Sequence, residues 1–152
     1  MWKRIFLGVL VILAAIQFIR QPKNLSSTGP TTDDLIVRTD PAPEIRLLLE
    51  TACYDCHSNS TKYPWYAKVQ PVGWWLANHI KDGKRHLNFS TFGLLTPKRA
   101  ANKLEQCADE VTEGSMPLAS YKLVHPDARL TPAQQNLLSN WFGLERSKYT
   151  IE

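Results

Sequence analysis

Two cysteines and a histidine stand close together in ACYDCHSNSTKYPW, the segment from Ala52 to Trp65. Cys53 and Cys56 are three positions apart, and His57 follows directly. Two thiols and an imidazole at this spacing suit three kinds of chemistry: half of a zinc site, a dithiol redox pair, or an attachment site for covalent haem. Other features of the chain have to discriminate among the three.

The sequence lacks a second ligand pair for a structural zinc site and an α/β setting for a thiol redox pair. A structural zinc site usually has four ligands in two closely spaced pairs, but the chain has no second CxxC and no HxxxH. A redox pair usually lies at a helix N-terminus in an α/β setting, whereas this pair follows a predicted helix and no βαβ pattern is visible. A plain disulfide is compatible with an exported chain. A zinc or disulfide module therefore stays open as an alternative.

Covalent haem would use every residue of the motif. Each thiol can add to a vinyl group of the porphyrin, and the spacing places both cysteines on one side of a helical turn. His57 can then direct its imidazole at the iron. Met116, the only methionine besides Met1, lies in the loop TEGSMPLASY. Pro117 disfavours helical backbone at Met116, which suits a thioether offered from a loop as the second ligand.

The first twenty residues predict a membrane anchor. Lys3 and Arg4 precede IFLGVLVILAAIQFI, in which Gln17 is the only polar residue. A helix from Trp2 to Ile19 would be about 27 Å long, close to the hydrocarbon thickness of a bilayer. No small-x-small cleavage site follows, so an uncleaved signal anchor is favoured over a removed signal peptide. We therefore expect one pass of the bacterial inner membrane with the remainder in the periplasm; the alternative is a soluble periplasmic chain after cleavage.

The charge balance argues against a nucleic-acid partner. The chain has 18 basic and 14 acidic residues. Removing the four basic residues of the anchor and its edges leaves 14 of each sign, so the basic pI comes from the anchor. These four are Lys3, Arg4, Arg20 and Lys23. Nucleic-acid binding therefore loses its usual electrostatic support.

Beyond the anchor we predict a linker over 21–40, an all-α domain over 41–145 and a tail over 146–152. Apolar residues recur at three- and four-residue spacing without period-two alternation. They predict four helices within segments 44–52, 71–83, 96–114 and 131–145. Thr96 and Thr131 are expected N-caps, the second in a capping box with Gln134, and Gly83 is an expected helix end. The apolar patch from Leu35 to Val37 is expected to pack back on the domain.

A resemblance to a known family rests on the run CYDCHSNSTKYPWYAKVQPVGWWLANHIKDGKRHLNFS together with GSMP and LSNWF. Over about residues 40–143 the chain resembles the bacterial haem-binding domain family of small exported proteins, and more broadly class I cytochromes c. The resemblance implies a compact helical fold around one haem c, with iron held by His57 and Met116. It also implies that the helix Glu44–Ala52 packs across the helix Ala133–Phe142.

Other residues are further candidates. His79, His86 and His125 are alternative distal ligands, with packing or hydrogen-bonding roles favoured for His79 and His125. His86 could bond a haem propionate through its ring or through the neighbouring Lys84 and Arg85.

Four clustered aromatic residues could wall the haem pocket or form a partner surface. They are Trp65, Tyr66, Trp74 and Trp75. Cys107 is expected to be buried and inert.

The sequence therefore favours a membrane-anchored periplasmic monohaem c-type cytochrome that exchanges single electrons with redox partner proteins. No nucleophile–base pair and no paired carboxylates argue for an enzyme. The alternatives are a haem-based sensor of small ligands or a peroxidase-like protein, in which the distal ligand leaves the iron, and the non-haem module described above.

Overall fold

The structure is a computed structural model that describes residues 1–149. Helices and turns build this part of the chain, and no strand occurs in it, so the predicted all-α class is confirmed. The α-helices are α1 (Trp2–Ile16), α2 (Leu35–Thr39), α3 (Pro43–Ala52), α4 (Tyr54–His57), α5 (Val72–His86), α6 (Pro97–Thr112), α7 (Ala119–Val124) and α8 (Pro132–Ser147). The 3₁₀ helices are η1 (Trp65–Lys68), η2 (Phe89–Leu94) and η3 (Pro126–Ala128).

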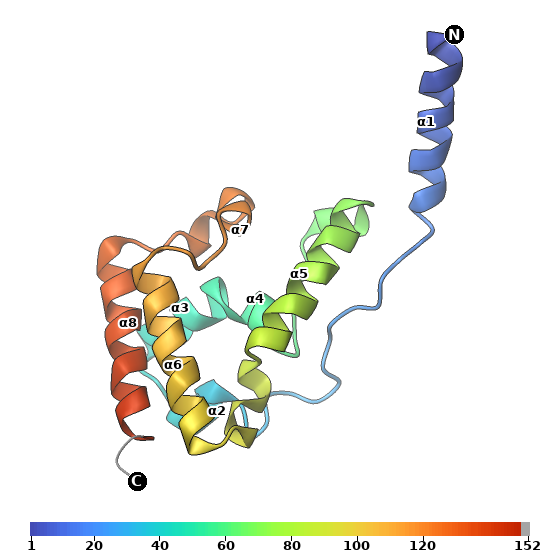
Figure 1. Ribbon diagram of the computed structural model, residues 1–152. Coiled ribbons are helices and arrows are strands. Elements are labelled where there is room, and N and C mark those ends of the chain that lie inside the picture. Colours follow the sequence, from blue (N-terminus) through green and yellow to red (C-terminus); the bar gives the residue numbers. More distant parts are fainter. Residues whose placement is uncertain (150–152) are drawn as a thin grey trace.

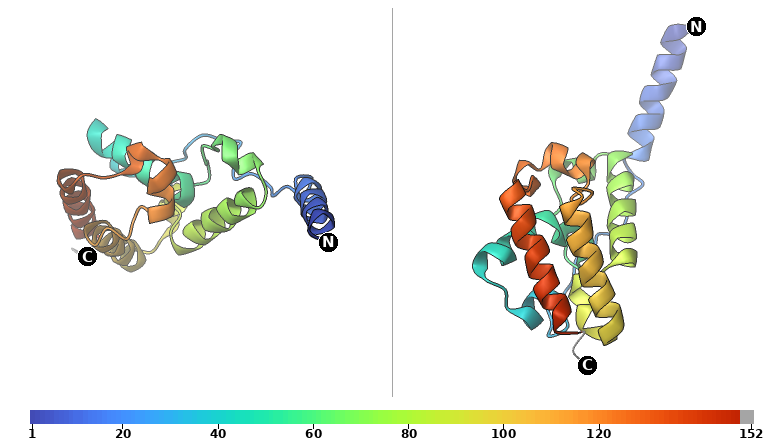
Figure 2. Two further views of the ribbon diagram at one scale, coloured as in Figure 1. Left: turned by 90° about the horizontal axis from the view of Figure 1, so that it is seen from above. Right: turned by 60° about the vertical axis from the view of Figure 1, so that its left-hand side comes forward.

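Helices α6 and α8 form the main helix pair of the domain. They lie antiparallel and side by side (Figures 1 and 2), and no other pair of elements has as extensive a contact. Leu104 of α6 and Leu138 and Phe142 of α8 are almost fully buried. Helix α3 contacts α8 as well. Helix α5 stands across from this pair (Figure 1) and packs on α4 and η1.

Part of the predicted linker belongs to the core. Leu35 is fully buried and Ile36 is 4% exposed, as expected for the apolar patch. Asp34 caps α2 by accepting a hydrogen bond from the backbone N–H of Ile36, and it also accepts one from the hydroxyl of Tyr54 at 2.8 Å. Because a buried carboxylate needs such donors, this contact fixes α2 against the helix that carries the cysteine motif.

Helix α5 does not end at Gly83 as predicted but continues to His86. A Cβ atom at position 83 would lie 2.9 Å from the carbonyl oxygen of Cys56. Glycine is therefore used here to let α5 approach the backbone of α4, not to end a helix.

Of the two predicted N-caps, one makes its capping hydrogen bonds and the other does not. The capping box of Thr131 and Gln134 is present at the start of α8. Thr96 lies at the N-cap of α6 but makes no side-chain capping bond. Helix α8 runs to Ser147, inside the predicted tail, and residues 150–152 of that tail lie outside the described residues.

The predicted single-pass anchor over 1–20 is wrong. Helix α1 has 15 residues, about 22 Å at ~1.5 Å per residue, against a hydrocarbon core of ~30 Å. Gln17 follows the helix, and its side chain exchanges two hydrogen bonds with the backbone of Gln70. Helix α1 stands apart from the rest of the domain (Figure 1). No helix within residues 1–149 is both long and apolar enough to cross a membrane.

The close approach at Gly83 generates a stability prediction. Gly83→Ala forces a Cβ against backbone atoms of Cys56, so we expect a net loss of about 1–3 kcal/mol in the free energy of unfolding. The matched control is Gly143→Ala in α8, where an added Cβ meets nothing within 4 Å. This control should stabilise the protein by about 0.5–1 kcal/mol through helix propensity. Urea unfolding measures both, and equal effects of the two changes would contradict the close-approach role.

Candidate functional site

A cavity of about 390 Å³ lies between α5 and α6 and is bounded by α4, by the segment before α7 and by Phe142 of α8. Its volume is in the range typical of sites for small molecules and cofactors. The sequence-predicted residues in its lining are Cys53, Cys56, His57, His79, His86 and Met116. Tertiary folding thus brings together residues from three separate parts of the chain: the cysteine motif, α5 and the loop that carries Met116.

The two thiols reach the cavity because the chain turns between α3 and α4. Cys53 lies at the junction of these helices, and its carbonyl accepts hydrogen bonds from the backbone N–H groups of Cys56 and His57. This single turn places both cysteines in the same wall, as the spacing predicted. Burial raises the pKa of Cys53 to about 12 and that of Cys56 to about 11. Both side chains are therefore protonated thiols at neutral pH.

His57 is held in the form that can bind a metal. Its Nδ1 lies 3.0 Å from the carbonyl oxygen of Leu87. A carbonyl only accepts, so Nδ1 carries the proton, and the lone pair is on Nε2. Burial lowers the pKa of His57, which keeps the ring neutral. A carbonyl partner on the second ring nitrogen is the usual arrangement of metal-ligating histidines.

Met116 enters the cavity lining from the loop that follows α6. Gly114 has φ +72°, a left-handed conformation that turns the chain away from the helix. The backbone N–H of Met116 then donates to the carbonyl of Glu110 at 3.1 Å, which folds the loop back on α6. The thioether is partly buried and lines the same cavity as His57.

The other three histidines differ in position. His79 lines the cavity; its Nδ1 bonds the carbonyl of Trp75 at 2.9 Å and its ring packs on that indole. His86 lines the cavity and is exposed. His125 lies outside the lining and stacks on Tyr121 with ring centroids 4.0 Å apart. Of the three, His79 and His86 therefore reach the cavity and His125 does not.

Lys84 and Arg85, suggested above as propionate partners, are engaged elsewhere and do not line the cavity. The Lys84 ammonium donates to the side-chain oxygen of Asn24 at 2.6 Å. Arg85 pairs with Asp82 at 3.2 Å on the surface. Of that basic turn, only His86 faces the cavity.

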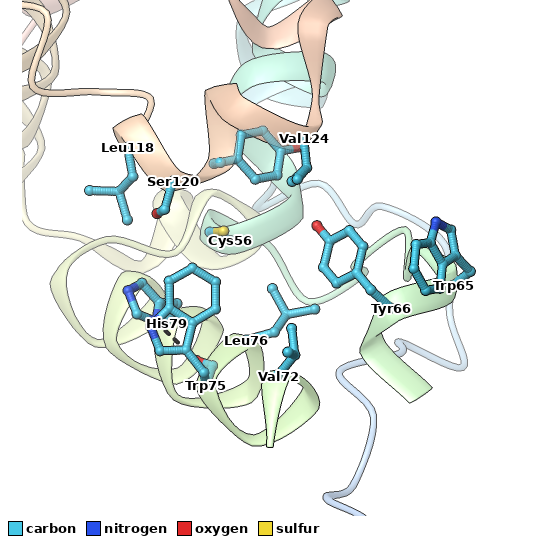
Figure 3. Close-up of a pocket in the computed structure, with 11 residues that line it drawn as sticks. Cys56, Trp65, Tyr66, Val72, Trp75, Leu76, His79, Leu118, Ser120 and Val124 are labelled. Atoms are coloured by element: carbon cyan, nitrogen blue, oxygen red, sulfur yellow. Dashed lines mark hydrogen bonds between the residues drawn. The ribbon is translucent and has the colours of Figure 1, made fainter. Parts of the chain in front are cut away.

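The aromatic cluster lines a second, adjoining cavity of about 300 Å³ and not the main one. Trp65, Tyr66 and Trp75 contribute to its wall, together with Cys56 and Leu118, which line both cavities. Figure 3 shows the Cys56 sulfur between Leu118 and Ser120 on one side and Trp75 and His79 on the other. Trp74 lies outside both linings and donates its indole N–H to the carbonyl of Ile19.

Among the lining residues that the sequence did not predict for the site are Cys107 and Tyr121. Cys107 was expected to be buried and inert, but it lines the cavity beside Lys103, Gln106, Glu110 and Val111 of α6. Tyr121 also lines the cavity. It belongs to α7, which has six residues, too few to give a periodic signal. Its hydrogen bond to Asp55, at 2.8 Å, had no sequence counterpart.

The residues in the cavity fit a haem group. Two thiols, a neutral imidazole and a thioether are the side chains that attach and ligate haem of the c type, and Phe89, Val111, Leu118 and Phe142 give the lining an apolar surface. Within residues 1–149, no three His, Cys, Asp or Glu side chains converge in a way that could hold a metal ion by themselves. The zinc alternative therefore finds no support in the arrangement.

Cys107 provides a test of the cavity as the haem site. Cys107→Trp places a large ring in the wall, and an overpacking cost of about 1–3 kcal/mol should weaken haem binding about 5- to 150-fold. Cys107→Ala should bind like the wild type because the thiol is not needed. Haem titration into haem-free protein, with circular dichroism to check folding, measures both. Wild-type affinity in the Trp variant would place the site elsewhere, and loss in the Ala variant would make Cys107 a ligand.

Comparison with known proteins agrees with this fit. The family described as haem-binding domain matches residues 11–143. No curated protein and no solved structure matches the chain, so the broader resemblance to class I cytochromes c stays a prediction. The matched range contains the cysteine motif, Met116 and every residue that lines the cavity. The chain belongs to the haem-binding domain family.

Proposed function

We propose that this chain is a monohaem c-type cytochrome that carries single electrons between redox partner proteins. One observation carries the proposal: Cys53, Cys56, His57 and Met116, from separate parts of the sequence, line one cavity of cofactor size. Family membership supports haem as the cofactor. The covalent attachment, the ligand pair and the carrier role are inferred from the side chains themselves.

The two cysteines are the attachment residues. Each S–H would add across a vinyl C=C bond of the porphyrin to give a thioether, with no leaving group. Burial keeps both thiols protonated in the haem-free protein, so attachment would need the thiolate to be generated when the haem enters. Cys53 is held at the junction of α3 and α4 and Cys56 is fixed by the approach of α5 at Gly83. The backbone at both positions is therefore set before attachment.

His57 and Met116 are the proposed iron ligands. The hydrogen bond from Nδ1 to Leu87 orients the imidazole and leaves Nε2 for the iron. Met116 is the distal candidate because its loop is fixed to α6 and contributes to the same cavity. A histidine and a methionine together favour a higher reduction potential than two histidines would.

Bound haem would supply a one-electron couple between ferric and ferrous iron. The chain would hold both ligands in place and limit water access through the apolar side chains of the lining. A carrier needs no more than this: fixed ligands and a site near the surface. The proposal therefore describes a carrier and not an enzyme.

Covalent attachment is tested by haem staining of a denaturing gel. The protein is expressed in a host that has the machinery for haem attachment. We expect a stained band at the mass of the chain, and no stain for the Cys53→Ala, Cys56→Ala double variant. Each single variant should keep one thioether and stain more weakly. Folded wild-type protein that binds haem but loses it on denaturation would exclude thioether attachment while leaving haem binding intact.

The identity of the distal ligand is tested by comparing Met116→Leu with His79→Leu. Leucine keeps the bulk of both side chains but cannot ligate iron. Met116→Leu should keep covalent haem, lose the ferric absorption that arises from thioether-to-iron charge transfer, bind carbon monoxide readily and show a lower reduction potential. His79→Leu should keep the thioether absorption. If His79 is the distal ligand instead, the wild type should lack the thioether absorption, and His79→Leu rather than Met116→Leu should let carbon monoxide bind readily.

Carbon monoxide binding also distinguishes an electron carrier from a haem-based sensor or a peroxidase-like protein. A sensor or peroxidase-like protein has a distal ligand that leaves easily, so the ferrous wild type would bind carbon monoxide at once. A carrier with both ligands firmly bound should resist it. Rapid binding by the wild type would favour a sensor or peroxidase-like protein.

A further inference from the structure

The two residues between the cysteines, Tyr54 and Asp55, tie the motif to other elements of the fold. Tyr54 holds α2 through Asp34, as described above. Asp55 reaches α7: its Oδ2 accepts a hydrogen bond from the Tyr121 hydroxyl at 2.8 Å. The other oxygen, Oδ1, accepts from the backbone N–H of Lys62 at 2.9 Å. The Asp55 carboxylate thus connects the loop after α4 with α7.

Tyr121 is well placed to act through this bond. Its hydroxyl also lies 3.3 Å from the carbonyl of Thr51, at the end of α3. Its ring stacks on His125, whose Nδ1 bonds the Tyr121 carbonyl at 3.2 Å. Burial and the neighbouring Asp55 carboxylate raise the pKa of Tyr121, so the hydroxyl stays protonated and donates. Tyr121 itself lines the haem cavity.

Helix α7 carries the Met116 loop and has few other supports. It packs chiefly on η3, which follows it directly in the chain. Lys122 of α7 donates to the carbonyl of Gly114 at 3.2 Å and so fixes the loop to the helix. The loop and α7 therefore form one unit, joined by the chain and by this hydrogen bond. The hydrogen bond between Tyr121 and Asp55 is the polar side-chain contact that joins this unit to the cysteine motif.

We infer that Tyr121 is a positioning residue for the distal side of the site. Through its hydrogen bond to Asp55 it holds the Met116 loop at a fixed distance from the helix that carries Cys53, Cys56 and His57. The inference rests on the proposed function, because Met116 matters most as an iron ligand. Tyr121 does so without touching the iron, through a bond between its hydroxyl and a carboxylate inside the motif.

The test uses Tyr121→Phe, which removes the hydroxyl but keeps the ring on His125. The matched control is Tyr63→Phe, since the Tyr63 hydroxyl accepts a hydrogen bond from the backbone N–H of Asn24, away from α7. All proteins are prepared with haem attached and also haem-free. Three quantities are measured: the thioether-to-iron absorption, the reduction potential, and the rate of Met116 oxidation by hydrogen peroxide. Met1, fully exposed at the chain start, is the internal reference for oxidation.

We expect Tyr121→Phe to keep covalent haem, weaken the thioether absorption and lower the reduction potential. Oxidation of Met116 relative to Met1 should rise about tenfold, because a charge-assisted hydrogen bond no longer holds the loop. Tyr63→Phe should match the wild type in all three. Asp55→Asn keeps an acceptor oxygen for Tyr121 and should restore most of the protection that Asp55→Ala loses. Adding Tyr121→Phe to Asp55→Ala should change these quantities less than Tyr121→Phe does in the wild type, as expected for two residues that share a hydrogen bond. The remaining change would come from the bond of the Tyr121 hydroxyl to the carbonyl of Thr51.

The outcomes separate the inference from the proposed function. Suppose that the wild type shows no thioether absorption, while Met116 is oxidised faster in Tyr121→Phe than in the wild type, with haem attached and haem-free. This result would support the positioning role of Tyr121 and reject Met116 as an iron ligand. Wild-type absorption and oxidation in Tyr121→Phe would overturn the positioning role and leave the ligand assignment standing. Additive effects of the Asp55→Ala and Tyr121→Phe changes would also overturn it.

Discussion

The helices α5 and α6 stand on opposite sides of a cavity, and the rest of the structure has to support them in that arrangement. Two helices that line a cavity of about 390 Å³ cannot bury their facing sides on each other, so each needs support from behind. Helix α6 obtains it from α8, through the most extensive helix contact of the domain. Helix α5 obtains it from α4, where Gly83 allows its backbone to approach that of Cys56. Each wall of the cavity is therefore packed against a second helix on its other side.

The cysteine motif lies where these supports meet. Each of its five residues has a separate task. Cys53 and Cys56 face the cavity, and His57 faces it with its second nitrogen held by Leu87. Tyr54 stacks on Phe89 and bonds Asp34, which joins the motif to the core and to α2. Asp55 bonds Lys62 and Tyr121. The two positions that are variable in the general pattern CxxCH are, in this chain, the residues that connect the site to the fold.

Much of the site followed from the sequence because local geometry decides it. The three-residue spacing of the cysteines fixes their common direction within one helical turn, and the capping box of Thr131 and Gln134 fixes the start of α8. Glycine 83 was read as a helix end because a local signal cannot distinguish that role from a close approach between helices. The same limit applies to Tyr121, whose partner is 66 positions earlier in the chain.

The N-terminal segment shows the same limit most clearly. Its hydropathy predicted a spanning helix to Ile19, but the helix ends at Ile16, where Gln17 bonds the backbone of Gln70. Residue types and short spacings by themselves determined the helical class, the cysteine motif with its histidine, and haem as the favoured cofactor, since these depend on backbone geometry within a few residues. Only the tertiary structure decided where α1 ends, which histidines line the cavity, and which residues connect the two sides of the cavity. Those features depend on contacts between segments far apart in the sequence, which no local pattern encodes.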